Sequence, residues 1–483
     1  MTGVWQVAAA ALQRAHELGC SHAWFREDQV RTAGLLLRDA NVVSTQDATD
    51  TGFSVRVVHD GAWGFAAGVD VTISSAVAVV EQAVAIAKAV AVGGRHGEPA
   101  EEPGYGDVSW VGPCAVDPFG VPEDERVALL ADWSGRLLGA PRVAHVMAKL
   151  VLVRENKFYA DLAGTTATQE RVRIHPQVLA FGDGATLRSC GPPTARGWEY
   201  VTGTGWDWDS ELAEMPSQLA AKTSATPVEP GRYDLVIEPS NLWLTVHETI
   251  GHATELDRAL GYETSYAGTT FVSPEHVGAL RYGSAHLSVT ADRTAEHSLA
   301  TIGYDDEGVA AQSWPLIDQG VLVGLQFDRH TARLFGAERS NGCSYAESGL
   351  HVPISRMPNV SVQPSPGGPD TAELIAAVED GIHIAGADSW SIDASRQNFQ
   401  FTAQRCHRIR HGQLAEPLRD VAYTGVTTAF WGSLDGTGGP GTYQVFGADL
   451  CGKGQPVQAA AVSHGSPSVL VRQIQVINTG GGS

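Results

Sequence analysis

Two histidines five positions apart, with a glutamate between them, set the strongest constraint on how this chain folds. The segment reads His247-Glu248-Thr249-Ile250-Gly251-His252. At about 100° per residue, its imidazoles would lie about 140° apart around a regular α-helix, so one metal ion could not bind both. One extra residue in a helical turn brings positions i and i+5 into line. Because glycine tolerates unusual backbone angles, we predict a π-bulge or local unwinding around Ile250 and Gly251.

The residues around this motif predict a strand followed by a helix. Residues 233–237 form an apolar run that is typical of a buried strand. Ser240 is a candidate N-cap and Gly261 a candidate C-cap. Apolar residues then recur at helical spacing, at Leu242, Val246 and Ile250. The motif is therefore expected in the middle of a helix, where the side chains of a metal site would be held rigidly.

Imidazole and thiolate ligands together suit zinc, and the sequence offers both. His247 and His252 are candidate metal ligands. From spacing alone any cysteine could supply a third ligand: Cys20, Cys114, Cys190, Cys343, Cys406 or Cys451. Burial as a packed thiol is the alternative for each, and the alternating segment around Cys406 favours packing there. Two histidines and one cysteine would leave a fourth position open, which is typical of a catalytic zinc site.

Glu248 is the candidate catalytic residue. It is the immediate neighbour of His247 and cannot readily share its metal, but it can take a proton from a metal-activated water. The alternative is an ordinary charge on the surface of a helix. Glu255 and Asp257 follow in the same segment. Either could hydrogen-bond a ligand imidazole, or both could belong to a solvated face.

Several segments resemble the TldD/PmbA family of metalloproteases. They are the histidine motif with its trailing acidic residues, and residues 61–67, 305–308, 316–320, 328–329, 356–359 and 451–455. The last of these resembles the loop that carries the family's third zinc ligand, so the resemblance implies Cys451 in that role. The chain looks like the metal-bearing (TldD-like) subunit rather than its metal-free partner, because it has all four residues: His247, Glu248, His252 and Cys451.

The resemblance implies a zinc-dependent peptidase, with Zn²⁺ as the cofactor, that hydrolyses peptides or unfolded segments by metal-activated water. It also implies a dimer, either a homodimer or a heterodimer with a metal-free paralogue. Two alternatives remain open. One is a zinc hydrolase that acts on a non-peptide amide or natural-product intermediate. The other is a non-catalytic partner subunit with a structural metal.

Charge and composition indicate which partners and which cellular compartment suit this chain. The formal net charge of −21 disfavours nucleic acids and anionic membranes as partners. The cysteines are sparse and show no C-x-x-C spacing, so no disulfide scaffold is expected. The N-terminus has no basic start followed by an apolar core. The apolar run at 77–92 is interrupted by Glu81, Gln82 and Lys88, which indicates an amphipathic helix rather than a membrane span. We expect a cytoplasmic protein.

The pattern along the chain predicts an α+β protein of two domains. Residues 1–225 would form a mixed α/β domain with antiparallel strands and long helices, and residues 226–483 a largely β domain that carries the metal helix. The predicted N-terminal strands are 22–27, 31–38, 53–58, 63–67, 143–153, 157–163 and 167–174, with helices at 5–18, 73–92 and 122–138. The predicted C-terminal strands are 287–302, 321–327, 360–362, 399–409 and 468–476, with a helix at 371–379.

Overall fold

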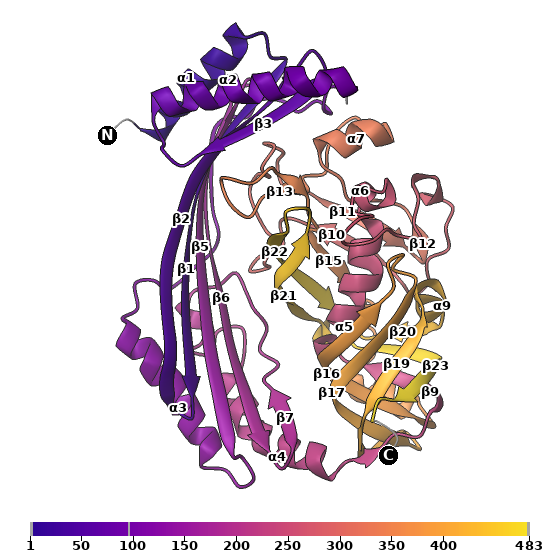
Figure 1. The fold of residues 1–483 in the computed structure, drawn as a ribbon. Helices are drawn as coiled ribbons and strands as arrows, with labels where there is room; N and C mark the ends of the chain where they lie inside the picture. The colour runs from indigo at the N-terminus through magenta and orange to yellow at the C-terminus, as the bar shows by residue number, and fades with distance from the viewer. Residues whose placement is uncertain (1–2, 95–96, 481–483) are drawn as a thin grey trace.

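The computed structural model describes residues 3–94 and 97–480. A long, curved sheet from the N-terminal half forms one side of the molecule, and a compact β-rich unit from the C-terminal half forms the other (Figure 1). Helices cover both ends of the long sheet. The predicted α+β class, with long helices in the N-terminal half and a largely β C-terminal half, is confirmed. The boundary between residues 225 and 226 stays a prediction.

The N-terminal sheet has the strand order β3-β2-β1-β5-β6-β4, and β7 pairs with β6. All described pairs in it are antiparallel except β4 with β6. The strands are β1 (His22–Arg38), β2 (Asn41–His59), β3 (Ala62–Gly68), β4 (Gly106–Val111), β5 (His145–Asp161), β6 (Thr165–Gly182) and β7 (Ala185–Arg188).

Two N-terminal strand predictions are wrong in the same way. Residues 22–27 and 31–38 form one strand, and the three strands predicted between 143 and 174 are the two strands of the β5–β6 hairpin. Polar residues in the middle of these strands suggested breaks. In β1, however, Asp28 is buried and Arg26 donates to Asp306 of the C-terminal half at 2.7 Å. These two polar side chains are therefore buried rather than exposed to solvent.

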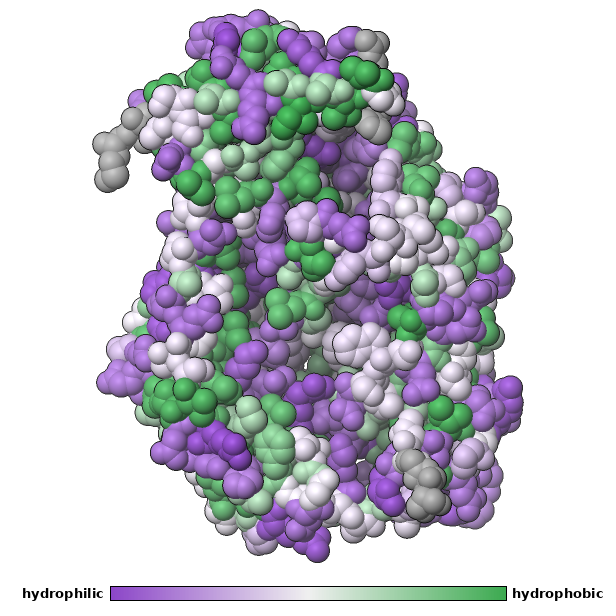
Figure 2. All heavy atoms as spheres, viewed as in Figure 1, coloured by the Kyte–Doolittle hydropathy of each residue, from purple (hydrophilic) through white to green (hydrophobic). Residues whose placement is uncertain are grey.

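Helices α1 (Val4–Glu17) and α2 (Ile73–Val90) lie across one end of this sheet (Figure 1). By length and composition the segment Ile73–Gly93 could cross a membrane. One face of α2 belongs to the core, through the fully buried residues Ala76, Val80, Ala83 and Ala87. Other apolar side chains near this end are exposed: Val69, Ile73, Ile86 and Val90. Figure 2 shows apolar residues among hydrophilic ones at this end of the molecule. Helices α3 (Glu123–Leu138) and α4 (Trp208–Ser224) cover the opposite end.

The close packing of α2 on β3 depends on Gly64. A Cβ added there would lie 1.9 Å from the backbone oxygen of Ala83. We expect Gly64→Ala to lower the free energy of unfolding by about 1–3 kcal/mol, because the helix must move away. Gly135→Ala in α3 is the control, since its Cβ meets nothing within 4 Å and alanine favours a helix interior by roughly 0.5–1 kcal/mol. Urea unfolding measures both, and equal stability of the two variants would contradict this packing argument.

In the C-terminal half, five strands close into a ring. Each pairs with two others in the order β9-β16-β17-β19-β23 and back to β9. They are β9 (Gly231–Ile237), β16 (Asp380–Ile392), β17 (Asn398–Arg410), β19 (Val421–Val426) and β23 (Val469–Asn478). The ring is extended by β8 (Thr226–Pro227), β18 (Gln413–Arg419) and β20 (Leu434–Thr437). Side chains from its strands contribute to a buried apolar core that also includes α5 and the smaller sheets.

Smaller sheets complete this half. The order β12-β11-β10-β15 joins β10 (Val289–Asp292), β11 (Ser313–Asp318), β12 (Val321–Leu322) and β15 (Asn359–Val362). Two further pairs are β13 (Ser344–Tyr345) with β14 (Ile354–Ser355), and β21 (Gln444–Lys453) with β22 (Gln458–Ser466). Short helices are α7 (Arg329–Phe335), α8 (Thr371–Ala376) and α9 (Thr427–Gly432).

Two C-terminal strand predictions are too long. Strand β10 covers only a small part of 287–302, where Leu299 and Ala300 are buried outside any strand. Strand β12 likewise covers only the start of 321–327. The backbone of Gln326 instead bonds to those of Thr254 and Leu256, just after the histidine motif. Because these residues are buried, their pattern resembles that of a strand, although their backbone groups form hydrogen bonds outside the strand pairs.

Candidate metal centre

The histidine motif lies in a distorted helix. Helix α5 (Pro239–Val246) leads into a π-helical turn at His247–Gly251, a 3₁₀ turn at His252–Thr254 and the short helix α6 (Leu256–Ala259). The predicted π-bulge is therefore confirmed. The N-cap prediction is wrong, because Glu238 occupies that position and Ser240 lies inside the helix. The hydroxyl of Ser240 instead accepts a hydrogen bond from the backbone N–H of Gly386, at 2.9 Å.

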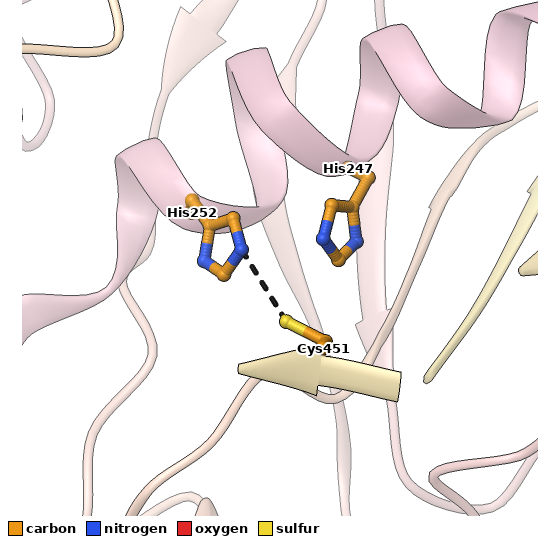
Figure 3. A group of neighbouring side chains, drawn as sticks. All are labelled: His247, His252 and Cys451. Carbon is orange, nitrogen blue, oxygen red and sulfur yellow. Dashed lines mark hydrogen bonds between the residues drawn. The ribbon is translucent and has the colours of Figure 1, made fainter. Parts of the chain in front are cut away.

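The bulge brings the two histidines to one side of the helix. Their ring centroids lie 4.6 Å apart. Cys451 on β21 faces them, and one ligand atom from each of the three residues lies within 4.8 Å of the others (Figure 3). The Cys451 Sγ is 3.4 Å from His252 Nε2. All three side chains are buried, so remote parts of the chain meet in an interior site.

Each imidazole uses its Nδ1 for a second contact. His252 Nδ1 lies 2.8 Å from Glu255 Oε2, and His247 Nδ1 lies 2.7 Å from His464 Nε2. These contacts leave the Nε2 atoms free for a metal ion. His464 on β22 was missed by sequence reasoning, because a lone histidine in a strand carries no spacing signal.

Glu255 and Asp257 belong to a buried ionic network. Lys453 is fully buried and donates to Glu255 at 3.0 Å and to Asp257 at 2.8 Å. Arg258 Nε donates to Glu255 at 3.1 Å. Burial would raise the pKa of Glu255, but Lys453 and His252 hold it well below the usual range. The alternative of a solvated face is wrong for both acidic residues, and Glu255 is the one that contacts an imidazole.

Glu248 lies beside His247 and His252 and is only 5% exposed, so the alternative of a surface charge is wrong. Arg396 Nη1 donates to its Oε2 at 2.5 Å. Burial opposes ionisation of Glu248, yet His252, His247 and Arg396 lower its pKa below the usual value. A carboxylate in this state can accept a proton. Arg396 was not singled out from the sequence, since it comes from the turn between β16 and β17.

A cavity of about 230 Å³ opens onto His247 and Glu248. It lies between the two halves of the protein, with His175 and Gln177 of β6 on one wall. Its apolar lining includes Trp243, Leu244, Trp390, Phe446 and Leu450. A second cavity of about 250 Å³ shares His175, Pro193, Asp449 and Leu450 with the first. The buried centre can therefore be reached from an elongated space between the halves.

The donor set fits a zinc ion. Two imidazole nitrogens and one sulfur are ligands that zinc prefers, and three protein ligands leave a position for water or substrate. Burial raises the pKa of Cys451, but the adjacent His252 more than offsets this and lowers it below the usual value, which favours the thiolate. Cys406, the competing cysteine, is buried on β17 and is not in this group. The ligand roles themselves stay predictions.

Comparison with known proteins identifies the class of protein. Residues 230–478 match the PmbA/TldA metallopeptidase C-terminal domain, and residues 26–87 match domain 1 of the same family. A metalloprotease of Methanothermobacter thermautotrophicus is 26% identical over 95% of this chain and 96% of its own length. A metalloprotease TldD homolog of Haemophilus influenzae is 25% identical, over 92% of this chain and 90% of its own length.

Solved structures share the fold. A Thermotoga maritima protein, named for a proposed role in modulating a DNA gyrase, superposes with a TM-score of 0.75 at 14% identity, covering 98% of this chain and 100% of its own. TldE from Thermococcus kodakarensis gives a TM-score of 0.71 at 13% identity, covering 97% and 99%. The matched family models and the relatives named metalloproteases define a metal-dependent peptidase. The chain belongs to the PmbA/TldD metallopeptidase family, as its motifs indicated.

Proposed function

We propose that this protein is a zinc-dependent peptidase whose metal is held by His247, His252 and Cys451. The observation that carries the proposal is the meeting of these three donor atoms beside Glu248, at the end of a cavity. A relative from Saccharolobus solfataricus, 25% identical over 56% of this chain and 57% of its own length, is named a zinc metalloprotease TldD homolog. That name supports zinc as the metal.

The chain's own residues then supply the proton transfers. Zinc in this site would polarise a scissile carbonyl and lower the pKa of a water molecule towards about 7. Glu248 takes the proton of the attacking water and passes it to the leaving amine. Arg396 holds the Glu248 carboxylate ionised and in place through their hydrogen bond. The buried surroundings keep this exchange away from bulk solvent.

Peptides or unfolded segments are the proposed substrates, and the elongated space between the halves supports that choice. A non-peptide amide is the second candidate, because the same donor set would serve it and only the cavity walls distinguish the two. Digestion of a peptide library with identification of the products tests this. A zinc-loaded protein that leaves every peptide intact would rule out peptides as substrates.

The assembly is proposed from the family resemblance, and the location from the free cysteines, which suit a reducing compartment. We propose a dimer, either of two copies or with a metal-free paralogue, that works in the cytoplasm. Light scattering of the purified chain, alone and with such a paralogue, measures the first property. Cell fractionation measures the second. A monomer under both conditions, or a protein found only outside the cytoplasm, would contradict the proposal.

Cys451→Ser tests the ligand set. We expect its zinc affinity to fall by about 100-fold, since losing even an outer partner of a zinc ligand costs about 10–100-fold. Peptide hydrolysis should be lost with the metal. The control is Cys406→Ser, a buried cysteine on β17 outside the donor cluster, which should keep its zinc. Competition with a chelator measures the affinity, and unchanged zinc binding by Cys451→Ser would remove Cys451 from the ligand set.

A further inference from the structure

His464 lies in the candidate metal site but has no role in the hydrolytic mechanism proposed above. It lies on β22, fully buried, with its ring parallel to that of Trp243 at a centroid distance of 6.3 Å. Both ring nitrogens have a partner. Nδ1 lies 2.9 Å from the backbone oxygen of Val360 on β15, and Nε2 lies 2.7 Å from His247 Nδ1. The imidazole therefore bridges a strand of the core and a candidate metal ligand.

These two contacts fix where the protons lie. A carbonyl oxygen can only accept, so His464 Nδ1 must carry the hydrogen that points to Val360. In a neutral imidazole the other nitrogen is then an acceptor. His464 Nε2 can therefore only accept from His247, whose own Nδ1 must be protonated. That leaves the lone pair of His247 on Nε2, the nitrogen on the side of His252 and Cys451 in Figure 3.

We propose that His464 is a positioning residue for His247. The Val360 carbonyl holds the hydrogen of His464 on Nδ1, so His464 Nε2 accepts a hydrogen bond from His247 Nδ1. This keeps Nε2 of His247 unprotonated and turned towards the metal. The inference rests on the proposed zinc site but not on the substrate. If the hydrogen bond between the two imidazoles ran the other way, His247 Nε2 would carry a proton and could not bind a metal. The Val360 carbonyl excludes that arrangement for a neutral His464.

The two candidate histidine ligands are thus oriented by different groups. His252 has the carboxylate of Glu255, which Lys453 and Arg258 neutralise. His247 has a neutral imidazole, which adds no charge to the interior. A carboxylate at position 464 would place another negative charge in the interior beside His247, and such a charge is costly without its own partner. A second histidine supplies the acceptor without that cost.

Two substitutions separate this role from simple packing. His464→Leu removes the acceptor, and we expect zinc affinity to fall by about 10–100-fold, the usual effect of losing an outer partner. His464→Gln places an amide oxygen near the former Nε2 and can still accept from His247, so it should fall by less than about tenfold. His383→Leu is the control, because His383 is another buried histidine, bonded to Glu238 at 2.8 Å, outside the donor cluster.

Zinc affinity is measured by competition with a chelator, and the Co²⁺-substituted proteins add a spectroscopic readout. We expect a changed Co²⁺ absorption spectrum for His464→Leu and an unchanged one for His383→Leu. Circular dichroism of the zinc-free variants shows whether each is folded. Equal zinc affinities of folded His464→Leu and the wild type would overturn the inference, and so would equal losses in His464→Leu, His464→Gln and His383→Leu.

The wild-type protein provides a test that needs no variant. Histidine-selective ¹⁵N labelling of the zinc-free protein reports which nitrogen of each imidazole carries a proton. We expect His247 protonated on Nδ1 and His464 protonated on Nδ1. A His247 protonated on Nε2 would refute the inference even if the protein cleaves peptides. Conversely, the protein could show the expected tautomers and bind zinc tightly but cleave no peptide. That result would contradict the proposed activity and would still support the role of His464.

Discussion

Replacement of Glu248 by Gln is expected to lower kcat for peptide hydrolysis by about 10²–10⁴-fold, the range attributed to general acid–base catalysis. The amide keeps the size of the side chain but cannot accept the proton of the attacking water. Glu248 lies beside the donor cluster and outside it, so zinc content should be unchanged. Stopped or quenched assays with a peptide cleaved by the wild type measure the rate, and metal analysis measures the zinc.

The matched control for this change is Asp388→Asn. Asp388 lines the same cavity but is not among the grouped metal donors. We expect its effect on kcat to be smaller than tenfold, since it has no part in the proton transfer. A Glu248→Gln protein that retains zinc and wild-type kcat would show that another group is the base. A protein that loses its zinc as well would show that Glu248 acts on the metal site itself.

The helical part of the candidate site could be predicted from the sequence because its geometry is local. Spacing alone required a distortion between His247 and His252, and the structure has a π-helical turn there. Cys451 could not be chosen from spacing, since its meeting with the histidines depends on how β21 is placed. Arg396 and His464 were not singled out for the same reason. A single polar residue in a turn or strand says nothing about its distant partner.

In the N-terminal half, the helices could be predicted from the sequence more accurately than the strands. Helices α1, α2 and α3 follow apolar periodicity, and their predicted bounds agree with the structure within a few residues. Strand β1 was divided in two because Asp28 and its neighbours are polar. Asp28 faces the C-terminal half, where Arg26 and Lys157 contact Asp306. Burial against a second polar surface cannot be distinguished from exposure to solvent by hydropathy along one strand.

Lys453→Met is expected to lower the free energy of unfolding by about 3–5 kcal/mol, the usual cost of removing one partner of a buried ion pair. Lys453 is fully buried and bonds to Glu255, Asp257 and the backbone oxygen of Ser355. Methionine fills a similar volume but leaves the carboxylates of Glu255 and Asp257 in the interior without the positive charge of Lys453. Urea unfolding of the zinc-free proteins at pH 7 measures the difference without a contribution from metal binding.

Asp257→Asn is the comparison within the same network, and its expected effect on the free energy of unfolding is smaller. Burial raises the pKa of Asp257 to about 6 from a usual 3.8, even though Lys453 opposes the shift. Its contribution to stability is therefore fully present below about pH 4 and is lost as the pH rises through about 6. At pH 7 the asparagine removes an unfavourable buried charge while Lys453 keeps Glu255, so this variant should lose far less stability than Lys453→Met. Equal losses would mean that packing, rather than charge, holds this part of the site together.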